Sequence, residues 1–377
     1  MHPFRRSRTV VALAAGALLV TACAGTTPEQ DRSTSASAVG EDAPEDDGPV
    51  EDGDAEPVLQ VVATVAPVSD LVAQVGGDRV EVRSLVPPGA DSHTYEPRPS
   101  DVGALEDADL YVGIGLALND GALSMAEATV RDGVRVVRLG EEALEDDALV
   151  FDHVHGDGDG HGHGGGSDHG HDHDDEGGDH GHSHGDGDGD SDVEPGPNPH
   201  VWTSVRIAAD LVDRIAVLLG DLDPEAADGY LERADAYTAQ LAELDEATAT
   251  ATATIPDDAR TLVTFHDAWT YFARDYDLEF ATAVQPADFT EPSASEVRDV
   301  IDLVRELDVP AVFGSEVFPS RVLEAVAGET DAVYIGDLAD DVLPGDPGDA
   351  EHSYLGLMRR NATTIVEGLG GDASALR

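Results

Sequence analysis

The alternation of short apolar runs with amphipathic stretches predicts an α/β protein with two lobes. Helix-like segments separate the apolar runs, and this order is typical of βαβ units, so each half should contain a mostly parallel sheet flanked by helices. With 377 residues, 41% of them hydrophobic, the chain can build two packed cores. Eight strand-like runs form two groups of four: 59–68, 78–86, 109–118 and 134–139, then 259–265, 278–284, 309–315 and 331–338.

Helical spacing of apolar residues places the first helices between these runs. Residues 68–75 and 101–108 have this spacing, and we expect Ser100 to cap the second of the two helices. A third helix should follow Ser204, where seven apolar residues recur at helical intervals. These residues are Ile207, Ala208, Leu211, Val212, Ile215, Leu218 and Leu219.

A long helix is predicted over about residues 229–254. At 1.5 Å per residue it would be roughly 40 Å long, enough to run from one lobe to the other, although a packed surface helix would have the same pattern. We therefore expect an N-terminal lobe over 58–228, a linking helix over 229–255 and a C-terminal lobe over 256–377. In the second lobe, the segment from Ser293 to Glu296 has the form of a capping box and should start another helix.

The charge of the chain excludes some partners. Acidic residues number 78 against 21 basic residues, all of them Arg, which gives a formal net charge of -57. Nucleic-acid binding is not expected from such a chain, because the phosphate backbone would repel it. A strongly acidic surface instead attracts cations.

The first 23 residues have the pattern of an export signal, with arginines followed by an apolar run. The segment Val20 to Cys23 resembles a bacterial lipobox, which predicts lipidation of Cys23 and anchoring to the outer face of the cytoplasmic membrane; an ordinary signal peptide with an incidental cysteine is the alternative. Arg5 and Arg6 leave the export route open between the general and the twin-arginine pathways. Residues 24–57 are acidic and polar and should form a disordered tether. Cys23 is the only cysteine, so no disulfide is expected.

Three histidines lie at junctions where ligands gather in α/β folds. His93 follows a strand in a proline-rich loop, His200 precedes a helix, and His266 ends a strand. Because they are spread over both halves, we expect a metal site in the cleft between the lobes. Asp340 should complete the ligand shell, with its neighbour Asp341 as the competing choice. Three imidazoles and a carboxylate suit Zn²⁺, whereas Mn²⁺ would favour more oxygen ligands.

A tract of His, Asp and Gly interrupts the first half over residues 152–192. It is too polar for a core and too rich in glycine for a helix, so it should be a disordered loop. Many imidazoles on such a loop would gather zinc weakly, as an auxiliary metal site. Its ten histidines are His153, His155, His161, His163, His169, His171, His173, His180, His182 and His184.

Several separated motifs give the chain a resemblance to a known family. The segments HTYEPRPSD, NPHVWTS, FHDAWTYFARDY, LADDVL and SYLGLMRRNATTIVEGL resemble those of the zinc/manganese-binding lipoproteins of bacterial ABC importers, the cluster A-I solute-binding proteins. The resemblance covers residue 58 to about 371. It implies two α/β lobes joined by one long helix, with metal held in the cleft and delivered to a membrane permease with its ATPase.

The resemblance also assigns residues and a metal. His93, His200, His266 and Asp340 match the four ligand positions of the family. Manganese-type members usually have Glu where this chain has His266, and zinc-type members often carry a His-rich loop, so the resemblance favours zinc. The chain departs from some zinc-type members in lacking a disulfide, and its sequence ADD replaces the more familiar TDS or SDA at the fourth ligand.

The function expected from the sequence is capture of extracytoplasmic Zn²⁺ by a monomeric binding protein without enzymatic activity. No HExxH pair occurs, and four protein ligands would leave no open position for an activated water. The alternatives are a manganese-binding homologue, or a metal-dependent surface adhesin or zinc buffer that is not coupled to transport.

Overall fold

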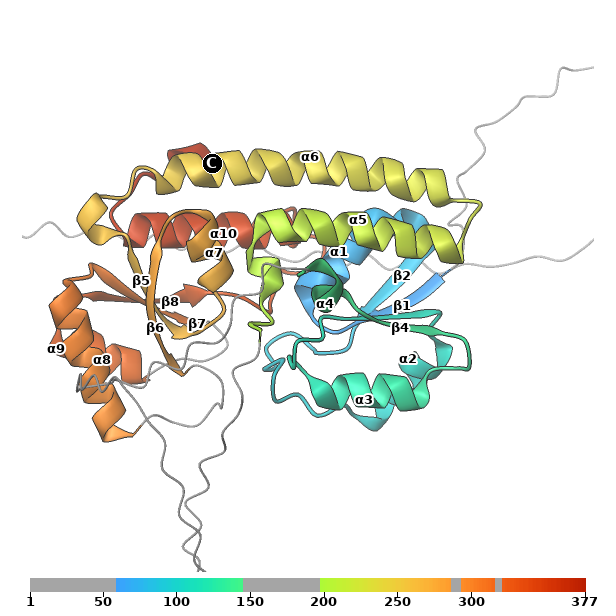
Figure 1. Cartoon of the computed structure of the whole chain (residues 1–377), viewed down its shortest axis with the longest axis horizontal. Helices are drawn as coiled ribbons and strands as arrows, with labels where there is room; N and C mark the ends of the chain where they lie inside the picture. Colours follow the sequence, from blue (N-terminus) through green and yellow to red (C-terminus); the bar gives the residue numbers. More distant parts are fainter. Residues whose placement is uncertain (1–58, 145–196, 286–292, 316–320) are drawn as a thin grey trace, which may run out of the picture. The chain divides into compact units, whose positions relative to one another are not determined.

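The computed structural model describes residues 59–144, 197–285, 293–315 and 321–377, which belong to one compact unit. Two four-stranded sheets, all of whose strand pairs are parallel, carry helices on their faces (Figure 1). The predicted two-lobe α/β fold is therefore confirmed. The signal segment with Cys23, the acidic tether and the His-rich tract lie outside the described residues.

The first lobe has the strand order β2-β1-β3-β4. Its order reverses between β1 and β3, and this switch point leaves room for ligands at the carboxyl ends of the strands. The strands are β1 (Leu59–Ala63), β2 (Val80–Ser84), β3 (Leu110–Gly113) and β4 (Arg135–Arg138). The helices between and after them are α1 (Ala66–Gly76), η1 (Gly77–Arg79), α2 (Pro99–Asp107), α3 (Asp120–Thr129) and α4 (Leu139–Ala143).

Two predicted strands of this lobe end earlier than their apolar runs. β1 stops at Ala63 because Pro67 lies in the first turn of α1, where proline is tolerated and its ring favours the helix. β3 stops at Gly113 because residues 115–117 turn with positive φ. The apolar run continues as a loop, in which Ile114 and Leu118 are both buried.

The predicted cap of α2 is wrong. The helix begins at Pro99, one residue before Ser100, so Ser100 lies inside its first turn. The carboxylate of Asp101 instead accepts a hydrogen bond of 2.7 Å from the backbone N–H of Arg98. An acidic group in the first turn satisfies a free N–H and also complements the helix dipole.

The second lobe repeats the first arrangement, with the strand order β6-β5-β7-β8. Its strands are β5 (Thr261–His266), β6 (Glu279–Gln285), β7 (Ala311–Ser315) and β8 (Val333–Leu338). Its helices are η3 (Asp257–Ala259), α7 (Thr270–Asp275), α8 (Ala294–Leu307), α9 (Arg321–Glu329), α10 (Tyr354–Gly368) and η4 (Ala373–Leu376). The predicted capping box of α8 is confirmed, since Ser293 and Glu296 cap each other's backbone N–H groups.

Alternation along the strands divides the second lobe into two cores. Successive side chains of a strand point to opposite faces, so Leu262 and Phe313 join the main core whereas Val263 and Val312 join a smaller one. The smaller core is completed by α8 and α9, and Val304 of α8 is buried within it.

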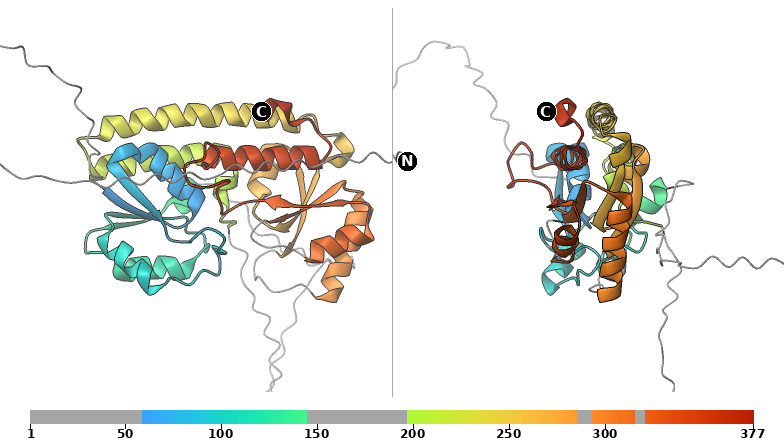
Figure 2. Two further views of the ribbon diagram at one scale, coloured as in Figure 1. Left: turned by 180° about the vertical axis from the view of Figure 1, so that it is seen from behind. Right: turned by 90° about the vertical axis from the view of Figure 1, so that its left-hand side faces the viewer.

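One long helix packs on both lobes. After η2 (Val201–Thr203), α5 (Val205–Leu222) leads into the 26-residue helix α6 (Ala227–Thr252). α6 packs on α1 and α5 of the first lobe and on α10 and η4 of the second (Figures 1 and 2). At 1.5 Å per residue α6 is about 39 Å long, so one helix reaches helices of both lobes.

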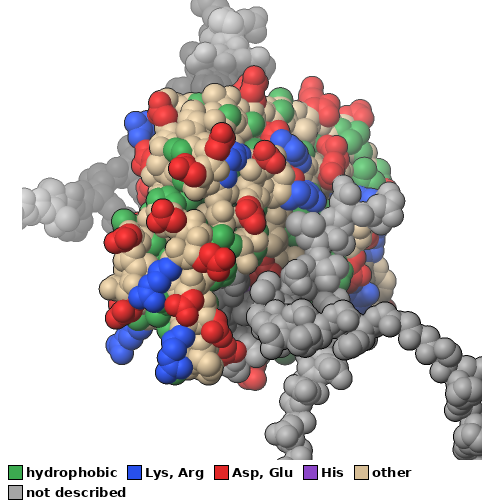
Figure 3. All heavy atoms as spheres, turned by 60° about the vertical axis from the view of Figure 1, so that its left-hand side comes forward, with side chains coloured by type: hydrophobic (Ala, Val, Ile, Leu, Met, Phe, Trp, Pro, Cys, Tyr) green, Lys and Arg blue, Asp and Glu red, His purple; other side chains and the backbone are tan. Residues whose placement is uncertain are grey.

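Acidic side chains outnumber basic ones among the described residues. Figure 3 shows Asp and Glu side chains scattered over one face, with fewer Arg side chains among them. Among the described helices, none has the length and apolar character needed to cross a membrane.

The packing of α5 yields a stability prediction. Leu211 is fully buried on α5, whereas 57% of Val217 is exposed on the same helix. Leu211→Ala should lower the free energy of unfolding by about 2–5 kcal/mol, because it leaves a cavity in the main core. The matched control Val217→Ala should change it by less than about 0.5 kcal/mol. Urea denaturation of the metal-free protein measures both, and equal effects would contradict the packing described for α5.

Candidate metal centre

Three histidines far apart in the sequence lie together in the structure. His93 is in the loop between β2 and α2, His200 immediately precedes η2, and His266 is the last residue of β5. One ring nitrogen from each lies within 4.8 Å of the others. We call this group the histidine cluster.

The rings of the histidine cluster face one another through the same atom. The Nε2 atom of His200 is 3.0 Å from Nε2 of His93 and 2.8 Å from Nε2 of His266. At most one proton can lie between each pair, and neutral Nε2 atoms without protons would direct their lone pairs at each other. A cation between the rings would remove this repulsion, because neutral imidazole nitrogen is a common metal ligand.

Burial opposes the protonation of two of these rings. His200 is fully buried and His266 is 5% exposed. Burial lowers the pKa of His93 and of His200 well below the ordinary value of 6.5, and the nearby His266 lowers both pKa values further. The two rings therefore resist protonation at neutral and mildly acidic pH, which leaves their nitrogens available to a metal.

The two candidate carboxylates have different surroundings. An Oδ2 atom of Asp340 lies 3.7 Å from Nε2 of His266, so this carboxylate faces the histidine cluster without belonging to the group within 4.8 Å. The Oδ2 atom of Asp341 instead accepts a hydrogen bond from the backbone N–H of Ser92. Burial, and then the charge of Asp340, raise the pKa of Asp341 to about 7. Asp340 is thus better placed than Asp341 to act as a fourth ligand. The hydrogen bond of Asp341 instead connects its loop to the loop of His93.

Trp202 is a site residue that the sequence analysis did not single out. Its indole N–H donates a 2.8 Å hydrogen bond to the backbone carbonyl of Asp340, and its ring lies 5.3 Å from that of His200. The hydroxyl of Tyr354, at the start of α10, donates to the carbonyl of Trp202. The only sequence signal was the position of Trp202 two residues after His200.

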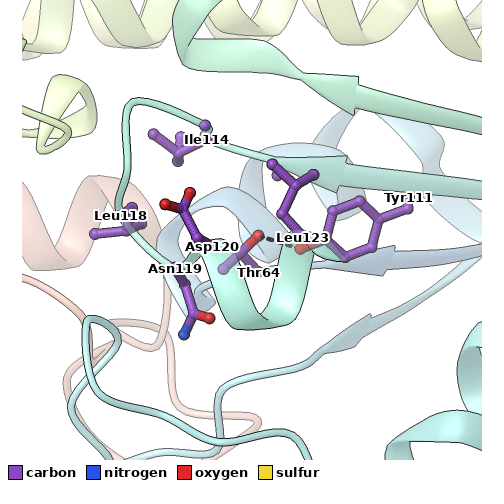
Figure 4. A pocket seen from close by; sticks show the side chains of 9 residues that line it. Thr64, Tyr111, Ile114, Leu118, Asn119, Asp120 and Leu123 are labelled. Carbon is purple, nitrogen blue, oxygen red and sulfur yellow. Dashed lines mark hydrogen bonds between the residues drawn. The ribbon is translucent and has the colours of Figure 1, made fainter. Parts of the chain in front are cut away.

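The cavities near the strand ends are small. One of about 10 Å³ is lined by His266, Trp269 and Asp340, and another of about 10 Å³ lies between the end of β3 and the start of α3 (Figure 4). In the second cavity the hydroxyls of Thr64 and Tyr111 are hydrogen-bonded to each other. Each has room for about one water molecule, so the cavity beside His266 fits an ion better than an organic ligand.

The structure does not describe the remaining predicted site residues. Cys23 and the ten histidines of the tract lie outside the described residues. His352, the other histidine of the described segments, donates from Nδ1 to the carbonyl of Pro344 at 3.1 Å and is not in the histidine cluster.

Comparison with known proteins gives relatives over most of the chain. It is 28% identical over 325 residues to the manganese-binding lipoprotein MntA of Halalkalibacterium halodurans, covering 86% of this chain and 92% of that protein. It is 26% identical over 320 residues to the iron-binding protein YfeA of Yersinia pestis, covering 83% of this chain and 86% of YfeA.

A solved structure has the same fold. The periplasmic zinc-binding protein TroA of Treponema pallidum matches with a TM-score of 0.67 and 26% identity, over 82% of this chain and 99% of TroA. The family model described as "Zinc-uptake complex component A periplasmic" (ZnuA) matches residues 61–368. Since that match includes both sheets and the segments that bear the histidine cluster, the chain belongs to the ZnuA family.

Proposed function

We propose that the protein captures Zn²⁺ outside the cytoplasm and delivers it to the permease of an ABC importer with its ATPase. By its family, the chain is a metal-binding substrate-binding component of an ABC transporter. The observation that carries the proposal is the convergence of three imidazole nitrogens within 4.8 Å, two of them from buried residues. The ion is cargo, so binding must be tight and still reversible.

The donor set supports zinc over manganese. Zinc accepts three nitrogens and one carboxylate oxygen in a tetrahedral shell, whereas manganese prefers more oxygen. We propose His93, His200, His266 and Asp340 as that shell. The relatives are named for manganese, iron and zinc, so the choice of zinc depends on the donors of this chain. Manganese binding is the second candidate.

Binding without catalysis fits the same shell. Four protein ligands leave no open position at which a zinc-bound water could act as a nucleophile. A metal-dependent adhesin or a zinc buffer that does not feed a transporter would use the same ligands. Importer genes beside this gene, and loss of zinc uptake on its deletion, would favour transport over both.

The segments outside the described residues complete the proposal. We propose that lipidation of Cys23 holds the protein, as a monomer, at the outer face of the cytoplasmic membrane, and that the tether over 24–57 spaces it from the lipid. The ten histidines between residues 153 and 184 would collect zinc weakly near the site.

Replacement of one ligand tests the zinc site. His93→Ala, His200→Ala and His266→Ala should each weaken zinc binding by at least about 100-fold, because each removes one of four donors, which costs more than loss of an outer-shell partner. His352→Ala is the matched control and should bind zinc like the wild type. Competitive titration with a chromophoric chelator measures all four, and manganese titrated in parallel should bind more weakly than zinc. Unchanged affinity in all three cluster variants would refute the site.

Proton competition should distinguish this site from exposed histidines. The pKa values of His93 and His200 are lowered, so both rings are still neutral when the pH falls to 6.5, and affinity should fall only at lower pH. Exposed histidines have the ordinary pKa near 6.5 and should lose zinc at higher pH. Zinc titrations between pH 7.5 and 5 of a variant without residues 152–192, and of a peptide with the tract sequence, give the two profiles. Loss of zinc by the variant and by the peptide over the same pH range would contradict the lowered pKa values of His93 and His200.

Removal of residues 152–192 tests the role of the tract. The deletion, closed by a short Gly-Ser linker, should keep one tight zinc site and abolish several weak ones, because all four proposed ligands lie outside the deleted segment. Growth should suffer only when a chelator makes zinc scarce. Calorimetry counts the sites: loss of the tight site, or a single site in the full chain, would contradict the auxiliary role.

A further inference from the structure

The chain contains only three asparagines, and all three are buried beside the proposed site. They are Asn119, Asn198 and Asn361, with exposed fractions of 8%, 1% and 0%. Each forms hydrogen bonds with backbone groups within two residues of a proposed ligand. In a chain that carries 78 Asp and Glu residues, each of these three side chains is a neutral amide and not a carboxylate.

Asn198 makes all four hydrogen bonds that a side-chain amide can make. Its Oδ1 atom accepts from the backbone N–H of His200 and from the ring Nδ1 of His200, both at 2.9 Å. Its Nδ2 atom donates to the backbone carbonyl of Asp267 at 2.7 Å and to the hydroxyl of Thr270 at 3.1 Å. One side chain thus holds the ring of His200 and the residue that follows His266.

These partners fix the orientation of the amide and the tautomer of the ring. A backbone N–H can only donate and a backbone carbonyl can only accept, so Oδ1 must face His200 and Nδ2 must face Asp267. Since Oδ1 has no proton to give, Nδ1 of His200 must carry the proton of the neutral ring. The lone pair is then on Nε2, the atom that faces His93 and His266.

Asn361, on α10, holds the residue before Asp340. Its Oδ1 atom accepts from the backbone N–H of Ala339 at 3.0 Å, and its Nδ2 atom donates to the carbonyl of the same residue at 2.6 Å. This pairing resembles that of a neighbouring strand, and it fixes the backbone of the loop after β8. The main chain directly before Asp340 is therefore held in place by the amide of Asn361.

Asn119 holds both sides of His93. Its Nδ2 atom donates to the carbonyls of Ser92 and Tyr95, and its Oδ1 atom accepts from the N–H of Ala122 at 2.7 Å, in the first turn of α3. In Figure 4 its amide points away from the carboxylate of Asp120. The loop of His93 is thereby fastened to the start of a helix.

We infer that the three asparagines are positioning residues that hold the four ligands of the cation site in binding geometry before the metal arrives. The inference depends on the proposed function, since it deepens the description of that same site. Each amide donates and accepts at once, which a carboxylate of the same shape cannot do. Outer-shell partners of this kind set the orientation and tautomer of metal ligands.

Isosteric substitution tests the inference in the full chain. Asn119→Asp, Asn198→Asp and Asn361→Asp replace an N–H donor with an oxygen that faces a carbonyl, and each should weaken zinc binding by about 10–100-fold. Asp223→Asn is the matched control, a buried change of the same size. Asp223 accepts from Arg79 and Tyr230 at the opposite end of α5 from His200, so its variant should keep the affinity of the wild type. Competitive zinc titration gives the affinities, and urea denaturation shows whether the variants are equally folded.

A second measurement needs no metal. In the metal-free wild type, nitrogen NMR of the histidine rings should show the proton of His200 on Nδ1 in a single tautomer. Asn198→Ala should give a mixture of tautomers or move the proton to Nε2, whereas Asp223→Asn should not. Asn198→Asp should keep the proton on Nδ1, because an oxygen acceptor remains, and still lose zinc affinity.

The outcomes separate this inference from the proposed function. Wild-type zinc binding that is lost in His266→Ala but unchanged in all three Asn→Asp variants would overturn the inference and leave the proposed function standing. Absence of zinc binding in the wild type would refute the proposed function, and the tautomer measurement would then decide the role of Asn198 alone. A wild-type His200 ring protonated on Nε2 would overturn that role.

Discussion

The Nε2 atom of buried His200 lies about 3 Å from the Nε2 atoms of both His93 and His266, and this proximity is the constraint on which the rest of the site depends. Without a proton or a cation between them, their lone pairs repel one another. Protonation is opposed by burial, which lowers the pKa of His93 and of His200. A metal ion is one species that can be stabilised by all three nitrogens together.

Helices and hydrogen bonds shared by the two lobes hold the histidine cluster together despite this repulsion. α6 packs on helices of both lobes. Asp70, on α1 of the first lobe, accepts from the backbone N–H of Tyr354, the first residue of α10, at 2.7 Å. The Tyr354 hydroxyl donates to Trp202, and the Trp202 indole donates to Asp340. These three hydrogen bonds, together with the side chains of Tyr354 and Trp202, thus link α1 of the first lobe to the backbone of Asp340 in the second.

Acidity and neutral donors have separate roles in this chain. The net charge of -57 creates a field that attracts cations of any kind. Selection among cations requires the buried set of neutral nitrogens, because imidazole favours zinc and similar ions over magnesium or calcium. The acidic side chains scattered over the face in Figure 3 lie at the surface, whereas the site interior combines buried His, Asn and Trp side chains with the buried carboxylates of Asp340 and Asp341.

The sequence by itself determined the two-lobe α/β fold, the eight strands and the capping box of α8, because these follow from local periodicity and from contacts between residues close in the chain. It missed the ends of β1 and β3 and the cap of α2, where proline, positive φ or an acidic group overrides the apolar pattern. Positions at the junctions of strands and helices, and then motif resemblance, selected His93, His200 and His266 as one set, but spacing could not choose between Asp340 and Asp341. The tertiary structure distinguished those two carboxylates. Asp341 accepts a hydrogen bond from the backbone N–H of Ser92, which lies in a loop about 250 residues earlier in the chain. The tertiary structure also gave the three asparagines their role, because their partners lie up to 72 residues away and no local pattern records such contacts.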